Sequence, residues 1–164
     1  MRTDRTRRTA ACGMLAALAS VLLVLGSLVD VLDLSCAAAA SLGVVYAHIE
    51  YGAKWSAAVW LCASVVSLLL FPRSAPLLFA LFAGPYPLFK AFAERRTQVV
   101  SWVCKLLFFN LALTAVLVVG VYLLGLEDFF GFTVVVYAAG NALFVLFDIA
   151  LTQLISVYYR RFRR

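Results

Sequence analysis

Both ends of this 164-residue chain are basic, and most of the sequence between them is apolar. The terminal arginines are Arg2, Arg5, Arg7 and Arg8 at the start and Arg160, Arg161, Arg163 and Arg164 at the end. Lys and Arg beside a membrane span resist translocation and so mark its cytoplasmic side. The two basic ends therefore predict that both termini lie in the cytoplasm and that the number of spans is even.

The composition supports a membrane protein. Hydrophobic residues make up 65% of the chain and the mean hydropathy is +1.01, whereas soluble domains are about 45–50% apolar. Several apolar runs approach the roughly 20 residues that cross a bilayer. We predict an all-α, polytopic, single-domain protein of a bacterial cell (plasma) membrane. Its net charge of +6 lies beside the runs, which indicates contact with anionic lipid and not with nucleic acid.

Six transmembrane helices fit the pattern of apolar runs and turns. We expect spans at about 10–32, 36–51, 55–71, 76–93 (broken at 84–87), 98–124 and 132–159. The second run is short and rich in alanine, but without it the two basic ends would face opposite sides of the membrane. The six-span arrangement puts thirteen of the fourteen Lys and Arg residues at the cytoplasmic side: the eight terminal arginines, Lys54, Lys90, Arg95, Arg96 and Lys105. Only Arg73 lies on the outer side.

The predicted outer turns are mildly acidic. They carry Asp30, Asp33, Glu127 and Asp128. Acidic residues are little constrained by translocation, so solvated loops explain them. The alternative is a rim at the mouth of a site that favours cationic or metal-bound solutes.

Asp148 lies well inside the sixth span, about three turns before its cytoplasmic end. A carboxylate at such depth costs up to about 2.5–3.5 kcal/mol, and such residues mark functional sites by default. At 100° per residue, one face of this helix carries Tyr137, Asn141, Asp148, Thr152 and Ser156. Two interpretations stay open: this stripe lines a site, or it forms hydrogen bonds that hold helices together.

The sequence Gly84-Pro85-Tyr86-Pro87 falls in the middle of the fourth span. Each proline removes a backbone donor and pushes the preceding residue toward extended geometry, so we expect a broken helix. Pro87 suits the start of the second half-helix, whose free N–H groups can bind an anionic group, as in transporters. The alternative is a structural break on which Asp148 itself docks.

Charged residues also gather near the predicted inner end: His48, Glu50, Lys54, Lys90, Glu94 and Lys105. For Lys105, which lies about two turns inside its span, we favour snorkelling to the cytoplasm. The alternative is a pair between Lys90 or Lys105 and Glu50, Glu94 or Asp148. Asn110 is a further polar group at mid-span. With one histidine, no CxxC pair and no nucleophile–base motif, we predict no metal, no cofactor and no enzymatic activity.

Three features resemble the substrate-binding (S) components of energy-coupling factor (ECF) transporters. Gly13-Met14-Leu15-Ala16-Ala17-Leu18 is similar to the Ala-x-x-x-Ala first helix of that family, with glycine in place of the first alanine. A tight turn, Tyr51-Gly52-x-Lys54, joins the second and third helices, and six spans fit in fewer than 200 residues. The resemblance implies a micronutrient importer that docks through Gly13 and Ala17 on a transmembrane coupling subunit driven by ATPase subunits.

Two main hypotheses follow. In the first, the protein is a solute-binding transport component whose pocket is lined by Asp148, Asn141, Asn110, Tyr137 and Tyr86, with Asp33, Glu127 and Asp128 at its mouth. In the second, it is a small membrane scaffold of cell-envelope assembly that binds protein partners and no solute, which a large apolar groove facing the lipid would favour. An intramembrane enzyme that acts on lipid with Asp148 as acid or base ranks third.

Overall fold

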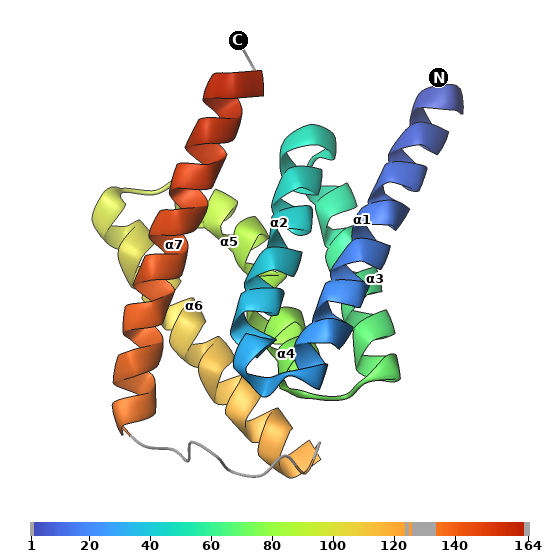
Figure 1. The fold of residues 1–164 in the computed structure, drawn as a ribbon. Coiled ribbons are helices and arrows are strands. Elements are labelled where there is room, and N and C mark those ends of the chain that lie inside the picture. Colours follow the sequence, from blue (N-terminus) through green and yellow to red (C-terminus); the bar gives the residue numbers. More distant parts are fainter. Residues whose placement is uncertain (1, 124, 126–133, 163–164) are drawn as a thin grey trace.

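The computed structural model describes residues 2–123, 125 and 134–162, and every regular element within them is helical (Figure 1). The α-helices are α1 (Arg2–Leu28), α2 (Asp33–Tyr51), α3 (Ala53–Leu70), α4 (Ser74–Leu78), α5 (Tyr86–Ala93), α6 (Gln98–Val118) and α7 (Val134–Phe162). Three short elements join or extend them: the 3-10 helix η1 (Asp30–Leu32) and the π-helices η2 (Phe79–Ala83) and η3 (Val119–Leu123).

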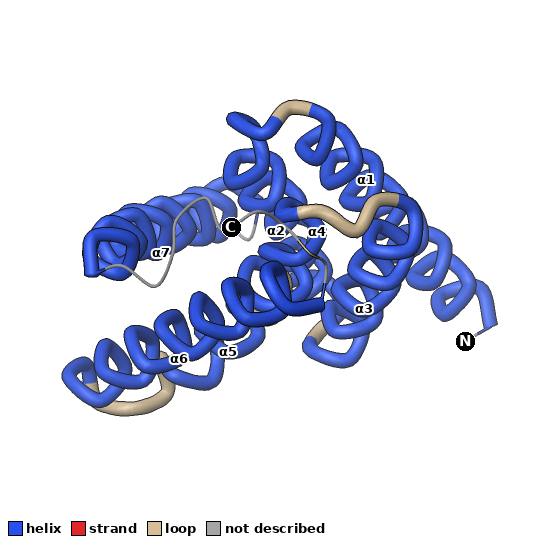
Figure 2. The backbone as a smooth tube through the Cα atoms, turned by 90° about the horizontal axis from the view of Figure 1, so that it is seen from below, coloured by secondary structure: helices blue, strands red, loops and turns tan. Residues whose placement is uncertain are grey.

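The central helix of the fold is α2, which packs against α1, α3, α4, η2 and α5 (Figure 2). Its buried side chains are mostly small: Asp33, Ala37, Ala40, Ser41, Val44, Val45 and Ala47. Small side chains let helix backbones approach closely where lipid supplies no hydrophobic driving force. At one such contact the Ser56 hydroxyl of α3 donates to the Val44 carbonyl at 2.9 Å.

The turn predicted between the second and third helices is confirmed at Gly52. Its φ of 89° lies in the region that favours glycine, and this single residue separates α2 from α3. The Gly52 N–H donates to the His48 carbonyl at 3.1 Å, and the Ser56 N–H donates to the Gly52 carbonyl at 3.1 Å. The two helices therefore fold back on each other without a loop.

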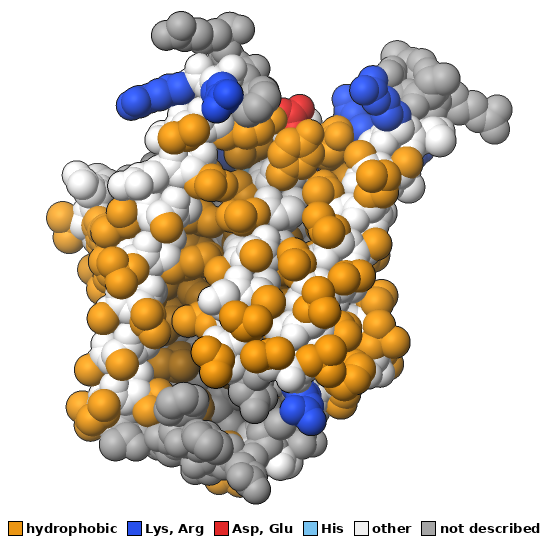
Figure 3. All heavy atoms as spheres, viewed as in Figure 1, with side chains coloured by type: hydrophobic (Ala, Val, Ile, Leu, Met, Phe, Trp, Pro, Cys, Tyr) orange, Lys and Arg blue, Asp and Glu red, His pale blue; other side chains and the backbone are white. Residues whose placement is uncertain are grey.

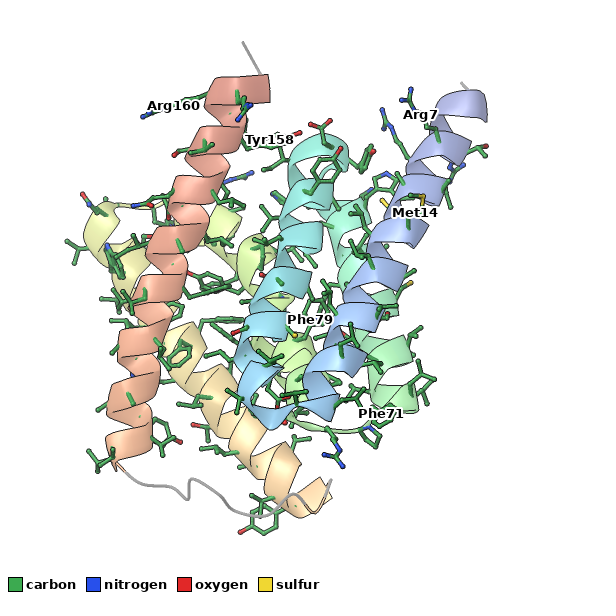
Figure 4. The ribbon with its side chains drawn as sticks, viewed as in Figure 1. Arg7, Met14, Phe71, Phe79, Tyr158 and Arg160 are labelled. Carbon is green, nitrogen blue, oxygen red and sulfur yellow. The ribbon has the colours of Figure 1, made fainter. Side chains whose placement is uncertain are left out.

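An aromatic cluster joins the α6–α7 pair to the rest of the molecule. Phe82 of η2 lies 5.2 Å from Phe109 of α6 between ring centroids, and Tyr86 of α5 lies 5.3 Å from Phe144 of α7. Phe109 and Phe144 stack on each other at 4.7 Å. At the end that carries the termini, Tyr158 of α7 points toward α2 (Figure 4) and donates to Glu50.

Large apolar side chains are exposed along α1, α3, α6 and α7. Five segments are long and apolar enough to cross a membrane: Arg5–Leu28, Ala53–Leu70, Ser74–Ala93, Gln98–Tyr122 and Val134–Arg161. Apolar atoms cover the middle of the molecule in Figure 3, and Lys and Arg atoms lie toward its two ends. The chain is thus rich in helices suited to a lipid environment.

The predicted spans correspond to the observed helices with shifted ends. The first helix includes the basic residues from Arg2 and ends at Leu28, because the chain turns into η1 before Asp33 begins α2. The predicted second span corresponds to α2, which is not among the five candidate spans. Its polar residues Asp33, His48 and Glu50 account for this lower hydropathy. The predicted turn at 125–128 lies outside the described residues, except for Gly125.

Candidate functional site

Asp148 of α7 lies at the centre of a group of ionic and polar side chains. The group, called the ion cluster below, consists of Tyr86, Lys90, Glu94, Lys105, Asp148 and Thr152. Oδ1 of Asp148 accepts hydrogen bonds from the Tyr86 hydroxyl and from Nζ of Lys90, and Oδ2 lies 3.2 Å from Nζ of Lys105. Three helices therefore meet at one carboxylate: α5, α6 and α7.

The three central charges are removed from solvent. Lys90 is 2% exposed, Lys105 is 4% exposed and Asp148 is 3% exposed. Burying an ion costs several kcal/mol, which a well-placed partner of opposite charge offsets. The side chains of Lys90 and Lys105 thus depend on the carboxylate between them, and Asp148 depends on both ammonium groups.

Glu94 lies at the solvent-exposed edge of the ion cluster. Its Oε1 lies 2.9 Å from Nζ of Lys105 and 3.3 Å from Nζ of Lys90. Its side chain is 46% exposed, unlike those of its partners. Nζ of Lys90 also donates to the Thr152 hydroxyl at 2.7 Å and to the Asp148 carbonyl at 3.2 Å. The cluster balances two ammonium groups with two carboxylates, and only one of the carboxylates is buried.

These contacts decide between the alternatives for the lysines. The favoured interpretation, that Lys105 snorkels to water, is wrong because its ammonium group is buried between Asp148 and Glu94. The alternative pairing is confirmed for both lysines. The sequence carried a signal for it: Tyr86, Lys90 and Glu94 are spaced four residues apart and so lie on one helix face.

The fourth span is interrupted just before the ion cluster. The π-helical turn η2 ends at Ala83, and α5 begins at Tyr86 with Pro87 in its first turn. The Gly84 N–H donates to the Phe79 carbonyl at 2.8 Å, a bond five residues long. The predicted extended geometry is wrong at Gly84, whose φ of −75° and ψ of −51° remain helical. The π turn accommodates Pro85 without an extended residue.

Trp60 of α3 supplies a hydrogen bond that the backbone lacks at the interruption. Its indole N–H donates to the Ala80 carbonyl at 3.0 Å, replacing a helical donor that Pro85 lacks. A Cβ added at Gly84 would lie 2.1 Å from Cδ1 of Trp60. Gly84 is therefore required because the indole packs directly on its backbone. Nothing in the local sequence signals this partner, which lies 20 residues before Ala80.

A second polar cluster holds α6 and α7 together. Asn110 and Asn141 exchange two side-chain amide hydrogen bonds, both of 3.1 Å. One helical turn away, four residues after Asn110 and four before Asn141, the hydroxyls of Thr114 and Tyr137 lie 2.9 Å apart. The five predicted substrate-binding residues thus divide between two clusters, because Asp148 and Tyr86 belong to the ion cluster. In this structure all five are hydrogen-bonded to protein groups, as the structural alternative for the polar stripe predicts.

Other predicted positions take no part in either cluster. Ser156 is exposed and bonds to the Gln153 carbonyl of its own helix. Asp33, expected at the mouth of a site, is buried and accepts a hydrogen bond from Ser74. Glu127 and Asp128 lie outside the described residues, as does the Asp30 side chain. Within the described part of the chain, His, Cys, Asp and Glu side chains form no group of three that could hold a metal ion.

An apolar groove of about 730 Å³ runs between α1 and α3. It is lined by Thr9, Cys12, Gly13, Ala16, Ala17, Ser20, Val21, Val24, Leu25, Trp55, Ala58, Val59, Cys62, Val66 and Leu70. Both predicted docking residues, Gly13 and Ala17, therefore lie in it. A Cβ added at Gly13 would have no neighbour within 4 Å, so this part of α1 is open to a partner or to lipid.

Comparisons with known proteins give no relative of this chain. No family model, curated protein or solved structure matches it.

Proposed function

We propose that the protein is a six-span component of the plasma membrane, with both termini in the cytoplasm, that binds a solute for transport. Arg7 and Arg160 lie at the same end of the molecule (Figure 4), which supports an even number of passes. The pass that is needed in addition to the five candidate spans is α2, a 19-residue helix between α1 and α3. Because surrounding helices bury much of its surface, α2 needs less apolar character to enter a membrane.

The buried ion cluster carries the proposal. Ionisable residues inside spans are costly, and they mark solute and ion pathways in membrane proteins. Here two lysines and an aspartate are each under 5% exposed. Lys90 lies one turn after the interruption of the fourth span, and Lys105 and Asp148 meet it from α6 and α7. Interrupted helices at binding sites are a recurring feature of transporters.

The test is binding of small molecules to the intact protein. Wild type and Asp148→Asn would be purified in nanodiscs and denatured, and the released molecules compared by mass spectrometry. We expect at least one solute to be enriched with wild type and lost with Asp148→Asn. Tyr137→Phe is the control, because it removes a hydroxyl from the second cluster and leaves the ion cluster intact. Identical profiles from all three proteins would contradict the proposal.

The α1–α3 groove supports a docking role for Gly13 and Ala17. In the transporter hypothesis its occupant is a helix of a coupling subunit that works with ATPase subunits. The double variant Gly13→Leu plus Ala17→Leu fills the groove and should abolish both copurification with that subunit and solute uptake. Met14→Phe plus Leu18→Phe adds bulk at exposed positions of α1 outside the groove and serves as the control. Normal uptake by the groove-filling variant would count against docking.

The second candidate function is a membrane scaffold of cell-envelope assembly. The groove favours it, because its small, apolar lining suits close packing of a transmembrane helix. In that case the groove-filling variant loses a protein partner, and Asp148→Asn changes stability without changing any solute. The groove-filling variant loses a protein partner under both candidates, so the solute profile of Asp148→Asn is the result that separates them.

A further inference from the structure

The ion cluster contains more positive than negative charge at its buried level. Lys90 and Lys105 are 2% and 4% exposed, but Asp148 is the one carboxylate of the cluster buried to a similar extent. Asp148 bonds to both ammonium groups and still neutralises only one charge. The second positive charge needs another anion.

Glu94 supplies that anion from a different environment. It is the residue directly after α5, and its side chain is 46% exposed. A single oxygen, Oε1, lies 2.9 Å from Nζ of Lys105 and 3.3 Å from Nζ of Lys90. Of the two carboxylates in the ion cluster, only that of Glu94 is open to solvent. The carboxylate of Glu94 is therefore the part of the cluster that an incoming anion displaces most easily.

The surroundings of Glu94 favour the approach of an anion. Arg95 and Arg96 follow it directly and are exposed, so they raise the positive potential beside the cluster. The Thr152 hydroxyl accepts from Nζ of Lys90 at 2.7 Å and donates to the Asp148 carbonyl at 2.7 Å, so it holds the ammonium group in place. Ammonium groups bind carboxylates and phosphates as compact point charges.

We infer that Lys90 and Lys105 form a binding site for a carboxylate or phosphate group, which replaces the Glu94 carboxylate from the exposed side of the cluster. Glu94 occupies the site when no ligand is present and so competes with the ligand. The identification of this anion as the charged group of a transported solute rests on the proposed function. The site itself does not, because the anionic headgroup of a lipid would have the same chemistry.

The test measures thermal unfolding in nanodiscs of zwitterionic lipid while inorganic phosphate or acetate replaces chloride at constant ionic strength. Glu94→Gln removes the internal competitor and should bind phosphate at least about fivefold more tightly than wild type, because a pair with buried lysines is no weaker than an exposed pair. Glu50→Gln is the matched control, since Glu50 pairs with Tyr158 outside the ion cluster. Adding Lys105→Gln to Glu94→Gln should remove the effect. Equal responses of Glu94→Gln and Glu50→Gln would overturn the inference.

A measurement on wild type keeps the inference testable if Glu94→Gln does not fold. In wild type, phosphate or phosphatidylglycerol should raise the unfolding temperature relative to chloride and zwitterionic lipid, and no shift with either anion would overturn the site. Nanodiscs with phosphatidylglycerol distinguish the sources of the anion. If the lipid is the ligand, phosphatidylglycerol alone gives the stabilisation and phosphate adds nothing. Anion binding without any captured solute would reject the proposed function and retain the site. A captured solute without anion binding would retain the proposed function and reject the site.

Discussion

Asp148→Asn tests the energetics of the ion cluster most directly, because the substitution nearly preserves shape and removes one charge. In wild type the carboxylate accepts hydrogen bonds from Tyr86, Lys90 and Lys105. The amide keeps one acceptor oxygen but turns an NH₂ group toward an ammonium group. Glu94 is then the only carboxylate left in the ion cluster to neutralise two lysines that are nearly inaccessible to solvent.

The expected cost follows from the stranded charge. Removing one partner of a buried ion pair destabilises proteins by about 3–5 kcal/mol. For chains of 150–250 residues, each kcal/mol lowers Tm by about 2–4 °C, so Asp148→Asn should lower Tm by about 6–20 °C. Unfolding in mixed micelles, followed by circular dichroism as dodecyl sulfate increases, gives the free energy directly.

A second substitution shows whether the stranded charge is the cause. Lys105→Met in the Asp148→Asn background removes one of the two lysines, and Lys90 then pairs with Glu94. We expect the double variant to recover about 0.5–3 kcal/mol relative to the sum of the single changes. Tyr137→Phe, which breaks one bond to Thr114, should cost only about 0.6 kcal/mol. A change below 1 kcal/mol in Asp148→Asn, or strictly additive effects, would refute this reasoning.

Three further predictions concern packing, cohesion and topology. Gly84→Ala should destabilise by about 1–3 kcal/mol, because its methyl group meets the Trp60 indole; Gly13→Ala, in open space, should change the micelle unfolding free energy far less. Asn141→Leu should cost about 1–3 kcal/mol in the same assay, because Oδ1 of Asn110 loses its hydrogen-bond donor; a neutral effect would show that the pair does not stabilise the fold. Arg73→Cys in a cysteine-free background should react with an impermeant maleimide from outside intact cells, and reaction only after lysis would reverse the proposed topology.

The sequence predicts the helices well because their lengths and turns depend mainly on residues that are close together in the chain. Apolar runs set the length of each span, and the turn at Gly52 follows from residue types that favour turns. The predicted second span, 36–51, is short and rich in alanine, and in the corresponding helix α2 the residues Asp33, His48 and Glu50 reduce the apolar character further. Its place at the centre of the fold, where other helices cover it, is a tertiary property that a single sequence does not express.

The candidate site was predicted in part. Helical periodicity grouped Asp148 with Asn141 and Tyr137, and all three do face other helices. Periodicity within one helix cannot tell which neighbour each residue meets, so it merged two clusters into one pocket. Likewise, the prolines indicated an interruption, but the π turn and the Trp60 indole that stabilise it arise from contact with α3.

The two clusters form consecutive parts of one polar seam between α6 and α7. On α6 the seam passes through Lys105, Asn110 and Thr114, nine residues or about 13 Å of helix. On α7 it passes from Asp148 to Tyr137, about 16 Å. That is roughly half of a hydrocarbon core of about 30 Å.

The seam also changes in character along its length. Side-chain exposure falls from 46% at Glu94, which directly follows α5, to 3% at Lys90, and Tyr86 is fully buried; each is one helical turn nearer the start of α5. Beyond Tyr86 and Asp148, neutral amides and hydroxyls pair across α6 and α7 in place of charges. Under the proposed function, an anion that displaces Glu94 would exchange ionic contacts first, and any movement further along the seam would exchange neutral hydrogen bonds. If the proposed transport follows this seam, α6 and α7 would have to separate there, and that motion would break the Asn110–Asn141 pair.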